Sequence, residues 1–227
     1  KAGAWVTKRV ATTLKAGLKE RSCTVCGTVV ESKAIDRLDP INSAAKFKDV
    51  SSGAWYKNAV DFAVGSGLFA GTSAKTFDPE VKMTRGMLVT VLGRLAGVDA
   101  SKYTTAYFED VSKSAYYFGY IEWARQNNIV SGTDTYIFEP DRAITRQEIC
   151  KIMVTFSDYM NITLTKNFAA KKFADAASIS SWARGYVTTC QRAGIISGDN
   201  KGMFRPTAGA TRAEVATILM NYCKNFF

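Results

Sequence analysis

Apolar positions recur along most of the chain at helical spacing, and the same pattern occurs three times. Reading from Phe47 gives FKDVSSGAWY, and reading from Phe108 gives FEDVSKSAYY, an offset of 61 residues. A third copy, FADAASISSW, begins at Phe173 and contains one extra residue near Ile179. So many matches in register predict three tandem repeats. We expect a leading segment and three repeats, spanning residues 1–46, 47–107, 108–172 and 173–227.

Each copy reads as a helix, a loop and a second helix. An aromatic residue opens the first apolar stretch at Trp55, Tyr116 and Trp182. The stretch ends at a residue type that tolerates left-handed backbone, at Gly67, Asn128 and Gly194. A Phe-x-Pro loop then leads to a Thr-Arg pair that starts the second helix.

Two of these starts contain a capping box, in which Thr caps the helix and Glu reaches back to the Thr amide. The pairs are Thr145 with Glu148 and Thr211 with Glu214. In the first copy Met87 replaces the Glu, and we expect a cap weaker by about 0.5–1 kcal/mol. A unit of this size cannot bury its apolar face alone, so the copies should pack together. The predicted fold is mainly α, a pseudo-threefold, three-pronged bundle with three similar clefts, preceded by a small β-rich segment.

The leading segment is rich in Val and Thr around a Cys-x-x-Cys-Gly turn, which predicts short antiparallel strands. Cys23 and Cys26 are half of a zinc ribbon, but a second such pair and His are missing, so we expect no metal. A local disulfide and two free thiols both fit. The other cysteines occupy small apolar repeat positions and should be core thiols: Cys150, Cys190 and Cys223.

Composition excludes several functions. The 227 residues include no His, which rules out Ser-His-Asp and Cys-His catalysis. No apolar run approaches the roughly 18 residues of a membrane span, so no membrane insertion is expected. The net charge of +10 suits nucleic acid, an anionic membrane surface or an anionic polymer; it is spread thin and no nucleic-acid module is present, so we do not expect nucleic acid. The chain begins at Lys1 without an initiator Met, which suggests a piece excised from a longer polypeptide.

Three repeated residue types are candidates for binding. An Arg just inside the second helix combines free helix N–H groups with a guanidinium and suits a carboxylate or phosphate, although it could instead pair with the Asp of the FxD motif. The aromatics could be core residues or sugar platforms, and the Gly after each apolar pair could serve a turn or a close ligand. The acid pairs Asp78–Glu80 and Glu139–Asp141 have no counterpart in copy three, so we expect no catalytic residues.

Three copies of FxDV…W…GIxxG…FxP…TRxE resemble the S-layer homology (SLH) domain over residues 47–227. The resemblance implies a cofactor-free, non-enzymatic anchor that holds a surface protein on the bacterial cell wall and displays upstream domains of the same polypeptide. The implied partner is the secondary cell wall polysaccharide, an anionic polymer often ending in pyruvylated N-acetylmannosamine. Residues 1–46 resemble the short CxxCG modules found beside such anchors.

The resemblance also implies a set of glycan-binding residues in grooves between repeats. They are Arg85, Arg146, Arg212, Asp49, Asp110, Asp175, Trp55, Tyr116, Trp182, Gly71, Gly132 and Gly198. Because Met87, Tyr116 and the FADAA start of copy three depart from the motif, we expect one or two competent grooves. Two rival hypotheses are self-assembly of a surface lattice and an enzyme that acts on wall glycans.

Overall fold

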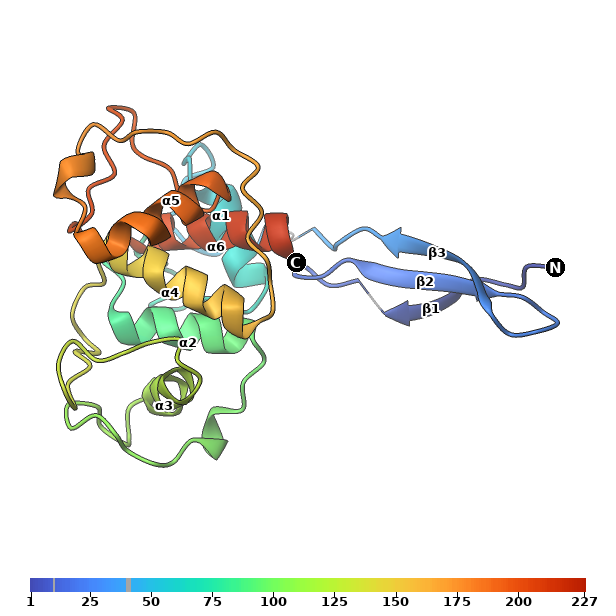
Figure 1. The fold of residues 1–227 in the computed structure, drawn as a ribbon, viewed down its shortest axis with the longest axis horizontal. Helices are drawn as coiled ribbons and strands as arrows, with labels where there is room; N and C mark the ends of the chain where they lie inside the picture. The colour runs from blue at the N-terminus through green and yellow to red at the C-terminus, as the bar shows by residue number, and fades with distance from the viewer. Residues whose placement is uncertain (10, 40–41) are drawn as a thin grey trace.

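A computed structural model describes residues 1–9, 11–39 and 42–227. It consists of a helical body, formed by the three repeats, and a narrow β-arm that projects from it (Figure 1). Val10, Pro40 and Ile41, which fall within the predicted leading segment, lie outside the described residues.

Each repeat contributes one pair of helices, which confirms the mainly α prediction. The first helices are α1 (Lys57–Gly65), α3 (Phe118–Gln126) and α5 (Arg184–Arg192), and the second helices are α2 (Arg85–Leu95), α4 (Arg146–Tyr159) and α6 (Arg212–Phe226). Short 3-10 turns occur at η1 (Ala100–Lys102), η2 (Ala176–Ser178) and η3 (Ser181–Ala183). None of the described helices is long and apolar enough to cross a membrane.

The repeats pack in a closed ring. The first helix of each repeat contacts the second helix of the repeat before it, so that α3 packs on α2 and α5 packs on α4. The ring closes because α1, in the first repeat, packs on α6, in the last. No repeat therefore has an uncovered end within the described body.

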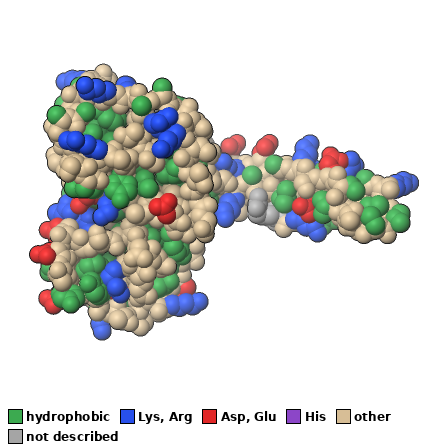
Figure 2. Space-filling model, viewed as in Figure 1, with side chains coloured by type: hydrophobic (Ala, Val, Ile, Leu, Met, Phe, Trp, Pro, Cys, Tyr) green, Lys and Arg blue, Asp and Glu red, His purple; other side chains and the backbone are tan. Residues whose placement is uncertain are grey.

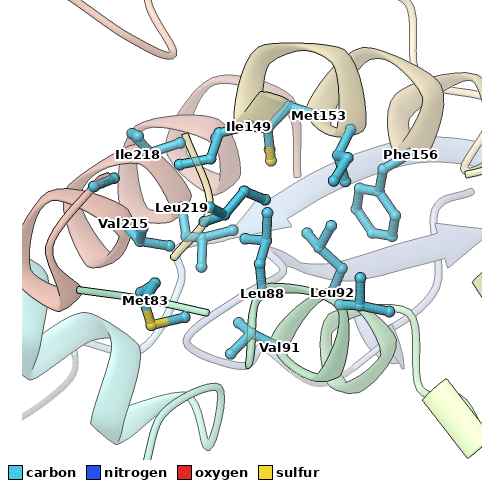
Figure 3. Packing of buried hydrophobic residues seen from close by; sticks show 14 of the residues in the cluster. Met83, Leu88, Val91, Leu92, Ile149, Met153, Phe156, Val215, Ile218 and Leu219 are labelled. Atoms are coloured by element: carbon cyan, nitrogen blue, oxygen red, sulfur yellow. The ribbon is translucent and has the colours of Figure 1, made fainter. Parts of the chain in front are cut away.

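The core lies where the three second helices meet (Figure 3). Leu88 and Leu92 of α2 face Met153 and Phe156 of α4 and Leu219 of α6, and all five side chains are fully buried. Their spacing within each helix is the helical repeat read from the sequence.

Three backbone hydrogen bonds close the ring at the loops that precede the second helices. The amide of Met83 donates to Ala210 O at 2.9 Å, that of Ala210 to Ile144 O at 3.2 Å, and that of Ile144 to Met83 O at 2.9 Å. Each of these residues is buried, so the bonds are shielded from water. The pseudo-threefold axis passes between them.

The helix termini follow the sequence predictions. Both capping boxes are present, at Thr145 with Glu148 and at Thr211 with Glu214. Thr84 accepts only the amide hydrogen of Met87, at 3.2 Å. The residues that end the first helices have φ values of 70°, 57° and 70°, at Gly67, Asn128 and Gly194.

The arm is a three-stranded antiparallel sheet, as predicted, with β1 (Val6–Arg9), β2 (Gly17–Ser22) and β3 (Val29–Ile35) in that order. Cys23 and Cys26 lie in the turn between β2 and β3 as free thiols, whereas the other three cysteines are buried in the body as predicted. Arg37 joins the arm to the body, because its guanidinium donates to Cys223 O and Lys224 O at the end of α6.

Candidate functional site

Three grooves lie at the junctions between repeats, and each is built from all three repeats. One repeat supplies the Arg, the next supplies the Gly loop and second helix, and the third supplies the exposed aromatic. We name each groove by its arginine. The Arg212 groove also contains Gly71 and Tyr116, the Arg85 groove Gly132 and Trp182, and the Arg146 groove Gly198 and Trp55. Their volumes are about 230, 390 and 510 Å³ in that order.

The arginines are buried at the junctions, where they tie one repeat to the next. Arg146 is 9% exposed, and it donates from Nε to Phe204 O at 2.7 Å and from Nη2 to Ser197 O at 3.0 Å. Its Nη1 pairs with Glu214 Oε1 at 3.2 Å. Arg85 makes the same three kinds of contact, with Phe138 O, Ser131 O and Glu148 Oε1, and burial lowers its pKa. The Arg–Asp ion pair considered above therefore does not form among the described residues.

The helix N–H groups beside these arginines are not free, and this expectation was wrong. The amides of Arg146 and Gln147 donate to Ala208 O and Pro206 O of the following repeat, both at 3.0 Å. The third amide, that of Glu148, donates to Thr145 Oγ1. The other two second helices have the same arrangement. A ligand in these grooves therefore meets a guanidinium without open helix amides.

The repeated aspartate of each copy holds the loop rather than lining the groove. Asp110 accepts the amide hydrogens of Phe138 and Glu139, at 2.8 and 2.6 Å. Glu139 has a φ of 57°, a left-handed conformation that an L residue adopts only when its surroundings fix it. Asp49 and Asp175 hold their loops in the same way. None of the described groove-lining residues is one of these aspartates.

The hydrogen bonds at Asp49 also shift the pKa of its carboxyl group. Burial alone would raise the pKa of this carboxyl, but the backbone amides of Phe77 and Asp78 outweigh it and hold the pKa below its ordinary value. The carboxylate is therefore the form that the folded loop stabilises. The structure thus gives all three predicted aspartates a positioning role.

The aromatics are exposed at the groove mouths rather than buried in the core. Trp55 is 66%, Tyr116 59% and Trp182 47% exposed, and each lies two residues before its first helix begins. An exposed ring beside a cavity offers a face for contact with a ligand. This exposure excludes the core alternative for the three aromatics, and the sugar platform stays a prediction.

The repeated glycines are required by packing within the repeat. A Cβ at Gly132 would lie 2.4 Å from Asp134 O and 2.5 Å from Ile137 O, both backbone atoms. At Gly71 a Cβ would lie 2.4 Å from the Phe47 ring. These glycines line the grooves, but the loop itself explains why a side chain is excluded.

Sequence comparison between copies missed three cationic groove residues, Arg94, Lys151 and Arg205. Their columns hold uncharged or acidic residues in the other copies, so no repeated signal marked them. On the face shown in Figure 2, charged side chains are scattered over the arm and body rather than gathered in one patch. The grooves therefore differ by individual residues rather than by a general surface charge.

A closed ring of three helix pairs with a groove at each junction defines a tandem-repeat binding module. The profile of the S-layer homology domain matches residues 46–86, 107–150 and 172–216, and the chain belongs to this family. SLH domains anchor surface proteins to the cell wall, and this is accordingly a cell-surface protein.

Three similar proteins illustrate the family. The chain is 29% identical over 173 residues to an amylopullulanase of Thermoanaerobacterium thermosulfurigenes, covering 76% of this chain and 9% of that protein. It is 27% identical over 190 residues to a surface-layer 125 kDa protein of Lysinibacillus sphaericus, covering 82% and 16%. It is 27% identical over 146 residues to a cellulosome-anchoring protein of Acetivibrio thermocellus, covering 63% and 32%. The chain thus spans a third or less of the length of each relative.

Proposed function

We propose that the three grooves bind an anionic secondary cell wall polysaccharide carrying pyruvylated N-acetylmannosamine, and so hold the protein on the wall without a covalent bond. The observation that carries the proposal is the repeated pairing of a buried arginine with an exposed aromatic ring from another repeat. A guanidinium recognises a carboxylate, which a pyruvate ketal supplies, while the ring offers an apolar face to a sugar. The polysaccharide, itself linked to peptidoglycan, is the proposed partner.

The proposed role is non-enzymatic, with the chain displaying other domains of the same polypeptide. The two glutamates in the grooves, Glu148 and Glu214, are each engaged by an arginine and by a capping box. They are therefore poor candidates for a free acid–base pair. Relatives named as glycan-degrading enzymes are matched over 9% and 16% of their lengths, which leaves room for catalysis outside the matched part.

Co-sedimentation with purified cell walls tests the proposal. We expect the chain to sediment with native walls and to stay in solution with walls stripped of secondary polysaccharide by mild acid. Sedimentation with both would assign binding to peptidoglycan. Failure to sediment with either, together with concentration-dependent oligomers in light scattering, would favour lattice self-assembly.

The exposed aromatics provide variants that leave the core intact. We expect Trp182→Ala to weaken wall binding about tenfold, since loss of a stacked ring costs about 1 kcal/mol or more. Tyr136→Ala is a matched control, because Tyr136 is 48% exposed and lies outside the three grooves as described. Equal binding by the two variants would contradict the groove assignment.

A further inference from the structure

The three grooves differ at the position that faces the buried arginine. Glu148 and Glu214 each place Oε1 3.2 Å from Nη1 of an arginine, Arg85 and Arg146 respectively. In the Arg212 groove the same column holds Met87, which lines the cavity but carries no charge. The Met therefore changes the electrostatics of the groove as well as the helix cap.

Arg212 is consequently left with an unused donor group. Its Nε donates to Phe77 O at 2.7 Å and its Nη2 to Ala70 O at 2.8 Å, while the guanidinium stacks 4.5 Å from the Phe77 ring centre. Within the described residues, Nη1 has no hydrogen-bond or ion-pair partner. The side chain is only 7% exposed and is held by two hydrogen bonds, while Nη1 is not among the buried unpaired atoms of the described residues and so opens to the groove.

A second guanidinium lines the same cavity. Arg94 of α2 donates from Nη1 to Leu68 O at 3.2 Å, on the loop whose Ala70 O accepts from Arg212. Tyr116 lines the same groove, and burial raises the pKa of its phenol, as does the Asp141 carboxylate, while Arg94 and Arg212 act against that rise. Two guanidinium groups and one hydroxyl therefore line the cavity, which gives it several hydrogen-bond donors.

In the other two grooves, carboxylates offset more of the positive charge. In the Arg85 groove, Glu148 offsets one of the two cations, Arg85 and Lys151. In the Arg146 groove, two cations meet two carboxylates, with Arg146 paired to Glu214 and Arg205 paired to Asp199 at 2.5 Å. Among the described lining residues, the Arg212 groove alone holds two arginines and no carboxylate, and the carboxylates that act on Arg212, those of Asp78 and Asp49, are not part of this lining.

We propose that the Arg212 groove is the principal anion site of the protein, and that Met87 and Arg94 give it that role. It takes one compact carboxylate or phosphate group, held by Nη1 of Arg212 together with Arg94 and Tyr116. The neutralised Arg146 groove, the largest of the three, takes uncharged sugar units. This inference rests on the proposed function, because it assigns the charged substituent of the wall polysaccharide to one groove.

The substitution Met87→Glu tests the inference without harming the fold. It places Glu at the position that Glu148 and Glu214 occupy in the other two copies. The new carboxylate should therefore pair with Arg212 and complete a capping box with Thr84. Met87→Gln is the matched control, since Gln also completes the box but adds no charge. Both variants should be at least as stable as the parent chain, and a loss of binding therefore cannot result from unfolding.

Isothermal titration with polysaccharide released from walls measures the effect. We expect Met87→Glu to weaken binding at least tenfold and Met87→Gln to stay within about twofold of the parent chain. Arg94→Gln should weaken binding about tenfold as well. A carboxylate source predicts that chemical reduction of the polysaccharide carboxyl groups abolishes the difference between Met87→Glu and Met87→Gln. A phosphate source predicts that the difference survives reduction and that inorganic phosphate competes.

Two results separate the inference from the proposed function. If the parent chain binds but Met87→Glu and Met87→Gln bind equally well, the anion assignment is overturned while wall binding stands. If the parent chain binds no polysaccharide, the proposed function fails, and titration with inorganic phosphate decides the inference alone. Phosphate binding that Met87→Glu removes would support the anion site, and no phosphate binding would refute it.

Discussion

The helical body and the β-arm use charged side chains in opposite ways. In the body, Arg146 is buried at a junction, where its N–H groups donate to carbonyl oxygens of the next repeat and its guanidinium lies over the Phe204 ring. In the arm, Lys19 and Arg21 lie over the Trp5 ring at the surface, 5.3 and 5.2 Å from its centre. Basic side chains thus hold repeats together in one region and cover a half-buried ring in the other.

The difference follows from how each region excludes water. The body has a core of three packed helices, whereas β3 is exposed along nearly its whole length. A charge-assisted hydrogen bond is worth more where its partners would otherwise be buried and unsatisfied. We therefore expect body and arm to respond very differently to the same substitution or reagent.

The thiols should show the largest contrast. Cys23 and Cys26 lie in the arm turn, and the backbone amide of Cys26 leads the contacts that lower the pKa of Cys23 to about 7. The buried thiols are shielded, and burial raises the pKa of Cys223 to about 12. With a thiol reagent at pH 7 we expect two fast groups and three that react on the order of a thousandfold more slowly. The rate at Cys23 should rise with pH and level off above about 7.

A sample kept without reductant provides the control for that experiment. If the two fast groups appear only after dithiothreitol treatment, Cys23 and Cys26 form the local disulfide that the sequence also allowed. More than two fast groups in reduced protein would mean that the body opens, contrary to the comparison.

Arg146→Met should produce the next largest effect. The change leaves Phe204 O and Ser197 O without their donor and removes the cation paired with the Glu214 carboxylate, and we expect a loss of about 3 kcal/mol in the free energy of unfolding. Arg21→Met in the arm should change it by about 0.5 kcal/mol or less, since surface ion pairs contribute little. Urea denaturation measures both variants. Equal losses would show that burial of the junction arginine is not what stabilises the body.

The sequence predicted the parts of this architecture that are encoded within one repeat. Capping boxes, helix ends such as Asn128 and the strand-rich leading segment all depend on neighbours a few residues apart. It could not predict which arginine meets which aromatic, because ring closure brings Arg85 beside Trp182 from a different repeat. The hydrogen bonds that occupy the N–H groups at the start of the second helices also run to another repeat, so the sequence did not predict them either.

The Phe-x-Pro loop was also only partly predictable. Its middle residue adopts left-handed backbone at Asp78, Glu139 and Arg205, with φ values of 55°, 57° and 58°. Asp tolerates that conformation, but Glu139 and Arg205 carry no such signal. The conformation is fixed by the aspartate that binds the loop amides from 28 to 30 residues earlier in the chain. A sequence pattern could show that this aspartate recurs, but the loop geometry was needed to show why.

Gly132→Ala tests how tightly a groove loop is packed. The new Cβ would clash with two backbone oxygens, and we expect a loss of about 2–3 kcal/mol in unfolding free energy. Gly185→Ala in α5 is the matched control, because a Cβ there meets no atom within 4 Å. It should stabilise the protein by about 0.5–1 kcal/mol through helix propensity. Thermal unfolding measures the stability of both variants. If Gly132→Ala leaves the stability unchanged, the loop must shift to make room for the Cβ.

Arg37→Ala should have the smallest effect, since it breaks the link between the two regions and spares both interiors. The guanidinium bonds two carbonyl groups at the end of α6, where a cation also favours the helix dipole, and we expect a cost of about 1 kcal/mol. Lys33→Ala, on the exposed face of β3, should cost almost nothing. Arg37→Lys keeps the charge but loses the forked donor, so its cost in stability should fall between those of Arg37→Ala and Lys33→Ala.

Limited proteolysis near residues 36–39 should be fastest in Arg37→Ala, slower in Arg37→Lys and slowest in Lys33→Ala, because these residues are held to the body through Arg37. If all three variants are cleaved at the parent rate, contacts elsewhere, such as Leu14 against the core, hold the arm in place.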